Sequence, residues 1–594
     1  MKTRKRLSAA VAALVLSAGT LAGCGSGSDT GAASATMVNV SAAQSAAEVL
    51  ADNQTAHTAT GSAAADAVNV VLDGSGATAD GEGVTVDGVT VTITAGGTYR
   101  LSGTLTDGQV VVDAADADVR LILDGVDIAS STTAAISATA VDTLVVELTD
   151  GTKNTLSDTD TYAENADVNA ALFSAGDLTL TGSGTLTVTG RGNDGIASTD
   201  GLVVESGTIT VVAADDGIRG KDYLVVDDGV ITITAGGDGL KADNSEEADA
   251  GYVAVNGGTV TVTADGDGAD AATDLLVTGG ELRLAAGGGH QVSPSEDAST
   301  KGLKSGVITV LEGGTVNVDS ADDAVHSDGA VHLNGSTLTA ASGDDGVHAE
   351  GALTIDAGTV AVTASVEGLE ATAVTQTGGE VSVTASDDGV NAAGGTAEEA
   401  GTDPAPGGGG EAVGDYAATV TGGTLVINAD GDGFDSNGTA TISGGTVVVN
   451  GPAGGGNGAL DVNGSFTVSG GLLVAAGSAG MAVAPGSDSP QGWVSATLDT
   501  PVEAGTTLQV VDAEGTVVAT FVTGKSVQNL VFSSADIAAG EEYGVYAGGT
   551  ASGASTGGLA ESGELASATP LVTVTAGEAP AGTGGGRGGG PNGR

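Results

Sequence analysis

The sequence has few aromatic residues, few prolines and a single cysteine. Aromatic residues occupy 2% of its 594 positions, whereas hydrophobic residues occupy 40% and are mostly Ala, Val, Leu and Ile. A conventional globular core depends on aromatic rings for much of its bulk. The composition therefore predicts a thin, repetitive core of stacked aliphatic side chains rather than several globular domains.

Basic residues are scarce as well. The 17 Lys and Arg residues face 76 Asp and Glu residues, which gives a formal net charge of -59 at pH 7. Binding to nucleic acid requires basic side chains against the phosphates, so we exclude nucleic acid as a partner, and anionic membrane surfaces with it. The charge favours cations, or polymers that are approached through cations.

The only cysteine follows a short basic and apolar segment at the start of the chain. Cys24 ends the sequence "LAGC", after the basic residues Lys2, Arg4, Lys5 and Arg6 and the apolar stretch 7–17. This order is typical of a bacterial lipoprotein signal, so we expect Cys24 to be lipidated and to become the mature N-terminus. An ordinary secretory signal with an incidental cysteine is the alternative. The expected location is extracytoplasmic, with the protein anchored to the cell membrane through this lipid alone.

Two further absences narrow the class of protein. With no cysteine after Cys24, the mature chain has no disulfide bond and no cysteine-ligated zinc. No later apolar stretch is long enough to be a transmembrane helix.

One sequence phrase recurs through the middle of the chain. It appears as "LVVESGTITVVAADDGIRG", "LVVDDGVITITAGGDGLKA" and "ATVTGGTLVINADGDGFDS", each with two short apolar strands, a glycine turn and an acidic turn. The glycine of the acidic turn recurs most often at an interval of 22 residues, as from Gly195 to Gly217. Alternation with a period of two residues predicts strands rather than helices. The interval suits one coil of a parallel β-helix, in which each coil buries its apolar face only by stacking on its neighbours.

We therefore predict an all-β fold, a right-handed parallel β-helix with about 22 residues per coil and a small C-terminal β cap. The segment before the first strands is rich in Ser, Ala, Thr and Gly and is expected to be flexible. The predicted organisation is a lipoprotein signal peptide (1–23), a flexible tether (24–65), N-terminal capping coils (66–175), a regular parallel β-helix (176–490), a C-terminal β cap (491–550) and a low-complexity tail (551–594).

Several of these motifs carry a resemblance to a known family. The run "TAGGTYRLSGTL", "VRLILDGVDI" and "ALFSAGDLTLTGSGTLTV", followed by "NDGIAS", "DDGIRGKD" and "GDGLKADN", resembles the bacterial carbohydrate-binding β-helix family. The resemblance covers about residues 66–550. It implies a fold related to that of pectate lyases, an extracellular location, bound calcium, and binding of cellulose or acidic plant polysaccharides without proven catalytic activity. Because one fold hosts many functions, it implies the fold more strongly than the ligand.

Acidic residues recur directly before the turn glycine. Coils stack about 4.8 Å apart, and two carboxylates at that distance repel by about 0.9 kcal/mol in bulk water and by more where they are partly desolvated. Calcium, which takes six to eight oxygen ligands, would relieve this repulsion. The alternative is that Asp-Gly and Asp-Asp-Gly are simple turn sequences, in which Asp caps the turn and Gly accepts a positive φ. The candidate calcium ligands are Asp215, Asp216, Asp238, Asp265, Asp267, Asp322, Asp323, Asp344, Asp345, Asp387, Asp388, Asp430 and Asp432, with the set at 322, 323, 344 and 345 the best.

A second column of polar residues lies two positions after the turn glycine. It begins with basic residues, passes through two histidines and ends with acids. One interpretation is mutual ion pairing with the acidic column, which contributes little per pair at a surface. The other is a polar strip that contacts the carboxylates of a uronic acid polymer, and the histidines are also possible metal ligands. The candidate ligand-binding residues of this strip and the neighbouring turn are Arg219, Lys241, Lys301, Lys304, His326, His348 and Glu370.

Three functions are compatible with these patterns. The first is a membrane-anchored, non-catalytic protein that binds an acidic or plant cell-wall polysaccharide through several calcium ions. The second is a calcium-dependent lyase of the pectate type, in which calcium acidifies a proton of the uronate and Arg219, Lys301 or Lys304 removes it. The third is a structural surface rod without a sugar ligand.

Overall fold

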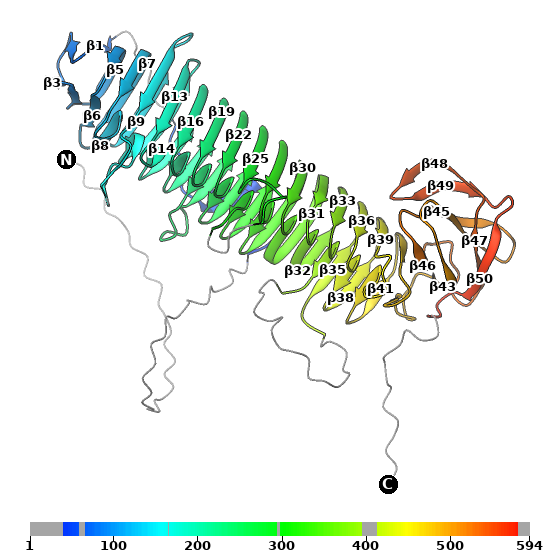
Figure 1. Cartoon of the computed structure of the whole chain (residues 1–594). Coiled ribbons are helices and arrows are strands. Elements are labelled where there is room, and N and C mark those ends of the chain that lie inside the picture. The colour runs from blue at the N-terminus through cyan, green and yellow to red at the C-terminus, as the bar shows by residue number, and fades with distance from the viewer. Residues whose placement is uncertain (1–39, 59–65, 164, 294–297, 395–412, 580–594) are drawn as a thin grey trace, which may run out of the picture. The chain divides into compact units, whose positions relative to one another are not determined.

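The computed structural model describes residues 40–58, 66–163, 165–293, 298–394 and 413–579. Within these ranges the chain forms one helix, α1 (Ala46–Asp52), and the strands β1–β50. Forty-four strands belong to one long sheet whose pairings are mostly parallel, and six form a second sheet. The expectation of an almost all-β chain is confirmed, and Figure 1 shows the strands stacked in successive rows.

In the middle of the chain, each strand pairs in parallel with the strand three positions further along, which produces three ladders. The first ladder, which precedes the acidic turns, contains β13 (Thr185–Gly190), β16 (Thr208–Ala213), β19 (Val230–Ala235), β22 (Thr259–Ala264), β25 (Glu281–Ala286), β28 (Thr315–Ser320), the ends of β30 (Ala330–Ser342) and β31 (Val347–Ala364), β33 (Glu380–Ala385), β36 (Thr424–Ala429), β39 (Thr446–Asn450) and β42 (Leu472–Gly477). The second ladder, which follows those turns, contains β14 (Asp194–Ser198), β17 (Ile218–Gly220), β20 (Leu240–Ala242), β23 (Ala269–Ala271), β26 (Leu303–Ser305), β29 (Val325–Ser327), the starts of β31 and β32 (Leu369–Gln376), β34 (Val390–Ala392), β37 (Phe434–Ser436) and β40 (Leu460–Val462). The third ladder contains β12 (Asp177–Gly182), β15 (Gly201–Val204), β18 (Tyr223–Val226), β21 (Tyr252–Val255), β24 (Asp274–Val277), β27 (Ile308–Leu311), the start of β30, the middle of β31, the end of β32, β35 (Ala417–Val420), β38 (Thr439–Ile442) and β41 (Phe466–Val468).

The register of the ladders follows the sequence repeat. In the second ladder, His326 of β29 pairs with His348 of β31, and Ser305 donates a hydrogen bond to Ser327, 22 residues further along the chain. Where the connection between two repeats is longer, the paired residues lie further apart in the sequence but the register of the ladder is kept, as for Lys241 and Asp270. Equivalent positions of successive repeats are therefore stacked neighbours.

Alternating side chains decide which face of each strand is buried. In β16, Ile209, Val211 and Ala213 are buried, whereas Thr208 is exposed. Residues from all three ladders, among them Val211, join one continuous apolar cluster. Burial of β-branched and aliphatic side chains on one face is what a period of two residues dictates.

The glycines of the acidic turns are needed for close approach between repeats. A Cβ atom added at Gly217 would lie 2.6 Å from the carbonyl oxygen of Gly239 and 2.4 Å from a methyl group of Ile233. Gly217 does not have a positive φ, and the left-handed conformation is found instead at the turn between the third and first ladders, as at Gly229 (φ 118°). The alternative interpretation of the acidic turn, in which its glycine accepts a positive φ, therefore does not explain Gly217, because the constraint there is steric contact with the next repeat.

Strands at both ends extend the long sheet. At the N-terminal side these are β1 (Val68–Gly74), β2 (Ala77–Ala79), β3 (Val84–Asp87), β4 (Thr90–Ile93), β5 (Gly97–Leu105), β6 (Gln109–Asp113), β7 (Asp118–Ala129), β8 (Ile136–Ala140), β9 (Thr143–Leu148), β10 (Lys153–Ser157) and β11 (Ala170–Ser174). At the C-terminal side, β43 (Trp493–Val502) and β42 each pair antiparallel with β46 (Val527–Ser533).

The second sheet has the strand order β48-β49-β45-β44-β47-β50. Its members are β44 (Thr507–Val511), β45 (Val517–Val522), β47 (Glu542–Ala547), β48 (Thr550–Thr556), β49 (Leu559–Glu564) and β50 (Thr569–Thr575). Residues 550–575 therefore belong to a sheet, although the sequence predicts that a low-complexity tail begins at residue 551. The strand-forming sequence "TPLVTVT" of β50 pairs with β47.

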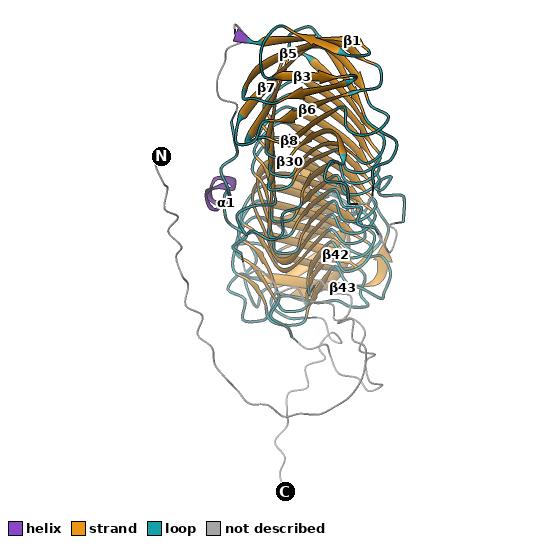
Figure 2. Ribbon diagram, turned by 90° about the vertical axis from the view of Figure 1, so that its left-hand side faces the viewer, coloured by secondary structure: helices purple, strands orange, loops and turns teal. Residues whose placement is uncertain are grey.

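The segment predicted to be a flexible tether is ordered between residues 40 and 58. Ser45 and Glu48 form a capping box at the start of α1, and Ala46 and Val49 pack on an apolar patch of the third ladder that includes Tyr252. Figure 2 shows α1 lying against the flank of the strands. The prediction of a flexible tether is wrong for residues 40–58, because α1 shields apolar side chains on the outer face of the third ladder from water. Within the described residues, no helix has the length and apolar character needed to cross a membrane.

Candidate cation- and ligand-binding edge

The connections between the first and second ladders place one side chain per repeat at the same edge. We define the turn column as the residues directly before the turn glycine or alanine. Its backbone is fixed by a ladder of hydrogen bonds, in which Gly217 N–H donates to Asp238 O (2.8 Å) and Gly239 N–H donates to Asp267 O (2.9 Å). The turn column consists of Asp194, Asp216, Asp238, Asp267, Lys301, Asp323, Asp345, Glu367, Asp388 and Asp432.

The carboxylates of the turn column also bind the backbone of the next repeat. Asp216 Oδ1 accepts from Asp238 N–H (2.9 Å), and Asp238 Oδ1 accepts from Asp267 N–H (2.7 Å). Asp388 and Asp432 are related in the same way (2.6 Å). One oxygen of each of these acids thus joins its turn to the turn of the next repeat, and Asp216 and Asp238 also contact Lys241.

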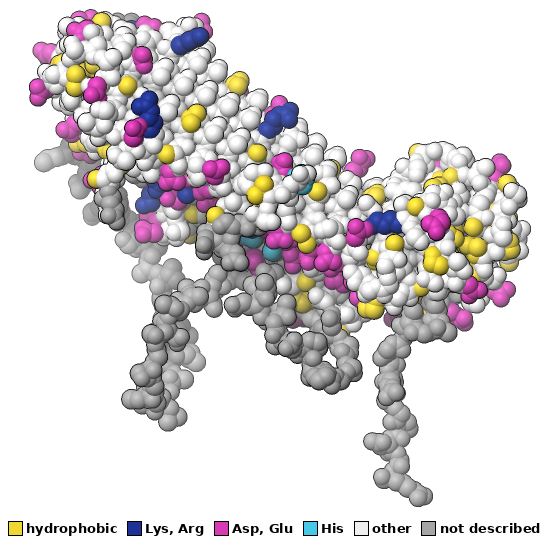
Figure 3. Space-filling view, viewed as in Figure 1, with side chains coloured by type: hydrophobic (Ala, Val, Ile, Leu, Met, Phe, Trp, Pro, Cys, Tyr) yellow, Lys and Arg dark blue, Asp and Glu magenta, His cyan; other side chains and the backbone are white. Residues whose placement is uncertain are grey.

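A second column, which we call the strand column, runs along the second ladder. Its members are successive register partners, for example Lys304 with His326 and His348 with Glu370. The strand column consists of Arg219, Lys241, Asp270, Lys304, His326, His348, Glu370, Asn391, Asp435 and Asp461. The prediction that these positions stack is confirmed, and Figure 3 shows acidic side chains gathered along one edge of the molecule together with histidines and basic residues.

The basic residues predicted to bind ligand are paired with acids. Lys241 Nζ contacts Asp238 (2.7 Å) and Asp216 (3.1 Å), and Arg219 contacts Asp243 (2.7 Å) and Asp194 (3.8 Å). Burial alone would lower the pKa of Lys241, but the hydrogen bond to Asp238 and the charge of Asp216 raise it. These contacts favour the ion-pairing interpretation of the strand column.

Lys301 and Lys304 follow the same pattern. Lys301 Nζ lies 3.0 Å from Asp322 and 2.7 Å from Asp323, and Lys304 Nζ lies 3.3 Å from both Asp267 and Asp270. Burial alone would lower the pKa of each ammonium, but the neighbouring carboxylates raise it in both. Each lysine is therefore held in its charged form.

The four acids predicted to form the best calcium site divide between two clusters. Ligand oxygens of Asp322, Asp323 and Asp344 lie within 4.8 Å of one another, whereas Asp345 belongs to a cluster with His348 and Glu370. Asp323 is 2% exposed, and burial would raise its pKa, but hydrogen bonds from His326 and His348 and the charge of Lys301 lower the pKa well below its usual value. The sequence analysis assigned the two histidines to ligand binding. In the structure they contact the acids of the turn column.

The acids toward the C-terminal end of the columns are under mutual repulsion. Burial, reinforced by the charges of neighbouring acids, raises the pKa of Glu370 to about 9. The exposed side chain of Asp344 is only partly desolvated, and this desolvation, together with the charges of Asp345 and Asp323, raises its pKa to about 6. The pKa of Asp388 rises to about 7 for the same reasons. A divalent cation would reverse this effect, because an opposite charge at short distance favours the ionised form.

The remaining predicted metal ligands lie apart from these clusters. Asp215, Asp265, Asp387 and Asp430 are exposed, and Asp430 contacts Lys525 of the C-terminal region (2.6 Å). Among the described residues, groups of three ligand atoms close enough for one ion are found only between residues 322 and 370. Cys24 lies outside the described residues.

Sequence reasoning missed two participants, Asp243 and Asp328. Asp243 binds Arg219 from the connection after β20, and Asp328 Oδ1 accepts from His326 Nε2 (3.1 Å). Asn391 Nδ2 donates to Glu367 Oε2 (2.7 Å), and both residues occupy positions of the two predicted columns. Asp243 carries no signal in the sequence because it lies in an irregular insertion, and Asp328 lies between β29 and β30, outside both columns.

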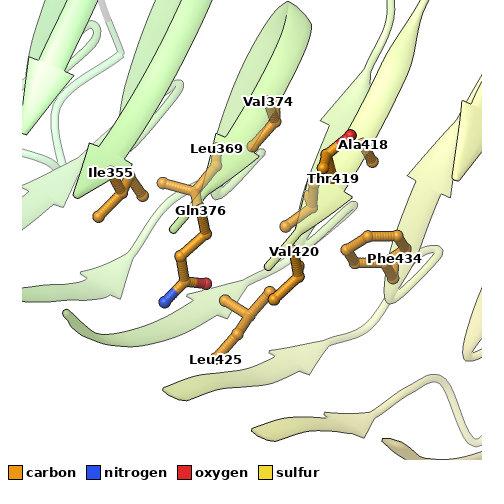
Figure 4. A pocket seen from close by; sticks show the side chains of 10 residues that line it. Ile355, Leu369, Val374, Gln376, Ala418, Thr419, Val420, Leu425 and Phe434 are labelled. Atoms are coloured by element: carbon orange, nitrogen blue, oxygen red, sulfur yellow. The ribbon is translucent and has the colours of Figure 1, made fainter. Parts of the chain in front are cut away.

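The interior cavity shown in Figure 4 is a different kind of feature. Leu369, Val374, Leu425 and Phe434 point into it from β32, β36 and β37. Gln376, also at the cavity, donates through Nε2 to the carbonyl oxygens of Gly378 and Thr424. Its apolar lining within the core makes it a packing gap and not a sugar site, since sugar hydroxyls need polar partners.

The fold and the edge define an all-β, repeat-containing protein with a stacked acidic edge, and part of the chain is similar to known proteins. Residues 87–346 match the family model described as "Carbohydrate-binding domain-containing protein". A curated relative of that description from Acetivibrio thermocellus is 35% identical over 126 residues, which is 20% of this chain and 44% of the relative. The match thus spans less than half of that relative's length.

One solved structure is also similar in sequence. It is described as a gadolinium derivative of the polysaccharide lyase-like protein from C. thermocellum, and it is 34% identical. The match covers 36% of this chain and 94% of that one, with a TM-score of 0.35.

Proposed function

We propose that this protein binds polysaccharide at the cell surface, without catalysis, through calcium ions held at the turn and strand columns. The observation that carries the proposal is the turn column, where nine of the ten stacked positions from Asp194 to Asp432 carry a carboxylate. An extended polysaccharide also repeats along one direction, so its sugars would follow the repeats of the protein. The match of residues 87–346 to a carbohydrate-binding family supports the same conclusion.

Calcium is the cation that this edge favours. It accepts carboxylate, carbonyl and water oxygens in irregular geometry, and Asp322, Asp323 and Asp344 bring three carboxylates within 4.8 Å of one another. Two of these acids are within the reach of Lys301, so the calcium ion would bind on the side of Asp344, which is exposed. There it would have free coordination positions for ligand oxygens.

The polymer is proposed to be acidic or of the plant cell-wall type. The basic residues of the two columns are occupied by ion pairs, so they do not offer their charge to a uronate carboxylate. Calcium bridging between carboxylates of the protein and of the polymer achieves that contact instead. Densely hydroxylated neutral polymers offer calcium the same kind of oxygen ligand.

The lyase alternative meets an obstacle in the same contacts. A lyase needs a basic group that loses its proton near neutral pH, whereas carboxylates raise the pKa of Lys301 and Lys304 above the ordinary value. The arrangement thus supports binding better than proton abstraction.

We also propose the finer fold and location. The three ladders share one apolar cluster, and connections between parallel strands are right-handed in nearly all proteins, so we infer that the ladders close into a right-handed parallel β-helix. The signal-like sequence ending at Cys24 supports a lipoprotein anchored to the cell membrane, with the bulk of the chain outside.

The test is retention of the mature chain on pectate gel and on insoluble cellulose, in calcium and in chelator. We expect retention in calcium, release by chelator, and weakened retention for Asp344→Asn. The matched control is Asp228→Asn, at an exposed aspartate of the glycine turn before β19, which should behave as the unmodified protein. Retention that chelator leaves unchanged would contradict the calcium bridge, and no retention on either polymer would favour the structural rod. Release of unsaturated uronides would reveal a lyase.

A further inference from the structure

Asp323 is the meeting point of two histidines from successive repeats. His326 Nδ1 lies 2.8 Å and His348 Nδ1 lies 3.6 Å from the same oxygen, Asp323 Oδ2. The two rings are nearly perpendicular, with centroids 5.0 Å apart. Asp345 Oδ2 lies 3.2 Å from His348 Nδ1. Two imidazole nitrogens and one carboxylate oxygen, those of His326, His348 and Asp323, therefore converge on one small volume.

The separations of these atoms match the coordination sphere of a small divalent ion. Ligands about 2.1 Å from a tetrahedral metal lie about 3.4 Å from one another, and Asp323 Oδ2 lies 2.8 Å from His326 Nδ1 and 3.6 Å from His348 Nδ1. The site is enclosed, because Asp323 and Asp345 are buried together with His326, and His348 is 9% exposed. Such a volume is better suited to an ion than to a polymer.

The surroundings of His326 provide an independent indication. Its Nδ1 faces the cluster, while Nε2 lies 3.1 Å from Asp328 Oδ1 on the opposite side of the ring. Metal-binding histidines characteristically donate their second N–H to a carboxylate, which fixes the tautomer and strengthens the ligand. Asp328 takes this outer position for His326.

His348 points to the same conclusion. Its Nε2 is buried and has no hydrogen-bond partner, so an imidazolium at this position would bury a charged N–H without an acceptor. A neutral imidazole bound to a metal through Nδ1 would leave only an uncharged N–H unpaired, which costs less. A metal therefore satisfies His348 better than a proton does.

We propose that Asp323, His326 and His348 form a binding site for a divalent transition-metal ion of the zinc type. Imidazole nitrogen favours zinc, copper, nickel and iron over calcium, which prefers oxygen. Lys301 contacts the same oxygen of Asp323 from the side of Asp322 and orients the carboxylate. The site is distinct in chemistry from the calcium positions at the exposed acids, and it does not depend on polysaccharide binding.

The test is titration of the metal-free mature chain with zinc chloride in a large excess of calcium, with cobalt chloride as a spectroscopic probe. We expect one zinc ion per chain to be retained against calcium, and cobalt to show the visible absorption of a nitrogen-ligated ion. His326→Gln and His348→Gln should each remove this absorption. Asp328→Asn, which leaves the ligands in place, should weaken zinc binding by about 10–100-fold.

His290→Gln is the matched control. His290 also contacts a carboxylate through Nδ1, that of Asp319 (2.8 Å), but its side chain is 30% exposed and lies outside the cluster, so this variant should bind zinc normally. Circular dichroism of each variant establishes that it is folded. The proposal is overturned if calcium displaces zinc at equal concentration, or if the cobalt spectrum is the same in folded His326→Gln and His348→Gln as in the unmodified chain. If the unmodified chain binds zinc as expected but is not retained on either polysaccharide, the proposed function is contradicted and the proposal of the metal site stands.

Discussion

Lys301 Nζ lies 2.7 Å from Asp323 Oδ2, in the following repeat. Lys301 occupies a turn-column position at which the flanking repeats carry Asp267 and Asp323. The chain thus places one of its few lysines within its own acidic column. There the ammonium supplies the positive charge that a bound cation would supply elsewhere along the edge.

Replacing this lysine should expose the repulsion between the acids. In calcium-free buffer, Lys301→Met should destabilise the protein by about 1–3 kcal/mol, because it removes one of the three basic partners of the buried Asp323 and leaves only His326 and His348. Added calcium should recover part of the loss and should bind more tightly than to the unmodified chain. Chemical denaturation with and without calcium measures both effects. Lys153→Met, at an exposed lysine of β10, should change neither quantity, and equal effects of the two substitutions would contradict the role of Lys301.

The turn glycines should be intolerant of a methyl group. Gly217→Ala should lower the free energy of unfolding by about 1–3 kcal/mol, because the added Cβ overlaps the next repeat. Gly455→Ala is the control, since a Cβ atom at Gly455 meets no other atom within 4 Å. Thermal unfolding of both variants checks this expectation. A Gly217→Ala protein as stable as Gly455→Ala would show that the repeats are less closely stacked than described.

The docking of α1 should depend on its buried face. Val49 is 5% exposed within the cluster that α1 forms with the third ladder, so Val49→Asp should remove about 1.5–3 kcal/mol of packing energy. Hydrogen exchange of the amides of residues 46–52 should then accelerate. Ala51→Asp places the same charge on the exposed face of α1 and should leave the exchange slow. Fast exchange in the unmodified chain would contradict stable docking.

Asp200 should make the protein less stable as the pH rises. Burial, together with the charges of Asp177 and Asp222, raises the pKa of Asp200 from 3.8 to about 6. The folded state therefore binds more protons between these two values, so the contribution of Asp200 to stability falls as the pH rises through that window and is lost above it. At pH 7, Asp200→Asn should raise the free energy of unfolding by about 1 kcal/mol. This is less than the pKa shift alone implies, because Asp200 is partly exposed to solvent.

At pH 3.5 the same substitution should change little, because the carboxyl group is then protonated in both states. Denaturant unfolding at the two pH values measures the difference. Asp87→Asn, at an exposed position of β3, should show no such dependence on pH. If Asp200→Asn and Asp87→Asn follow the same profile, the assignment of the effect to Asp200 is wrong.

The sequence by itself determined the strand content and the stacking of equivalent positions. Val211 and Ile233 pair because the alternation of apolar residues repeats in phase, and a parallel ladder conserves that phase from strand to strand. The succession from Lys304 through His326 and His348 to Glu370 could likewise be predicted. The spacing of the repeat contains this information because each repeat contacts mainly its neighbours.

Only the tertiary structure decided which charged groups pair and which atoms converge. Asp323 and Asp345 look equivalent in the sequence, yet Asp323 binds Lys301 and His326 whereas Asp345 lies with Glu370. Side-chain direction and burial separate them, and both depend on the neighbouring repeats rather than on the turn sequence alone. The docking of α1 on Tyr252 also joins residues about 200 positions apart, and no local pattern specifies a contact between an amphipathic helix and a distant apolar patch.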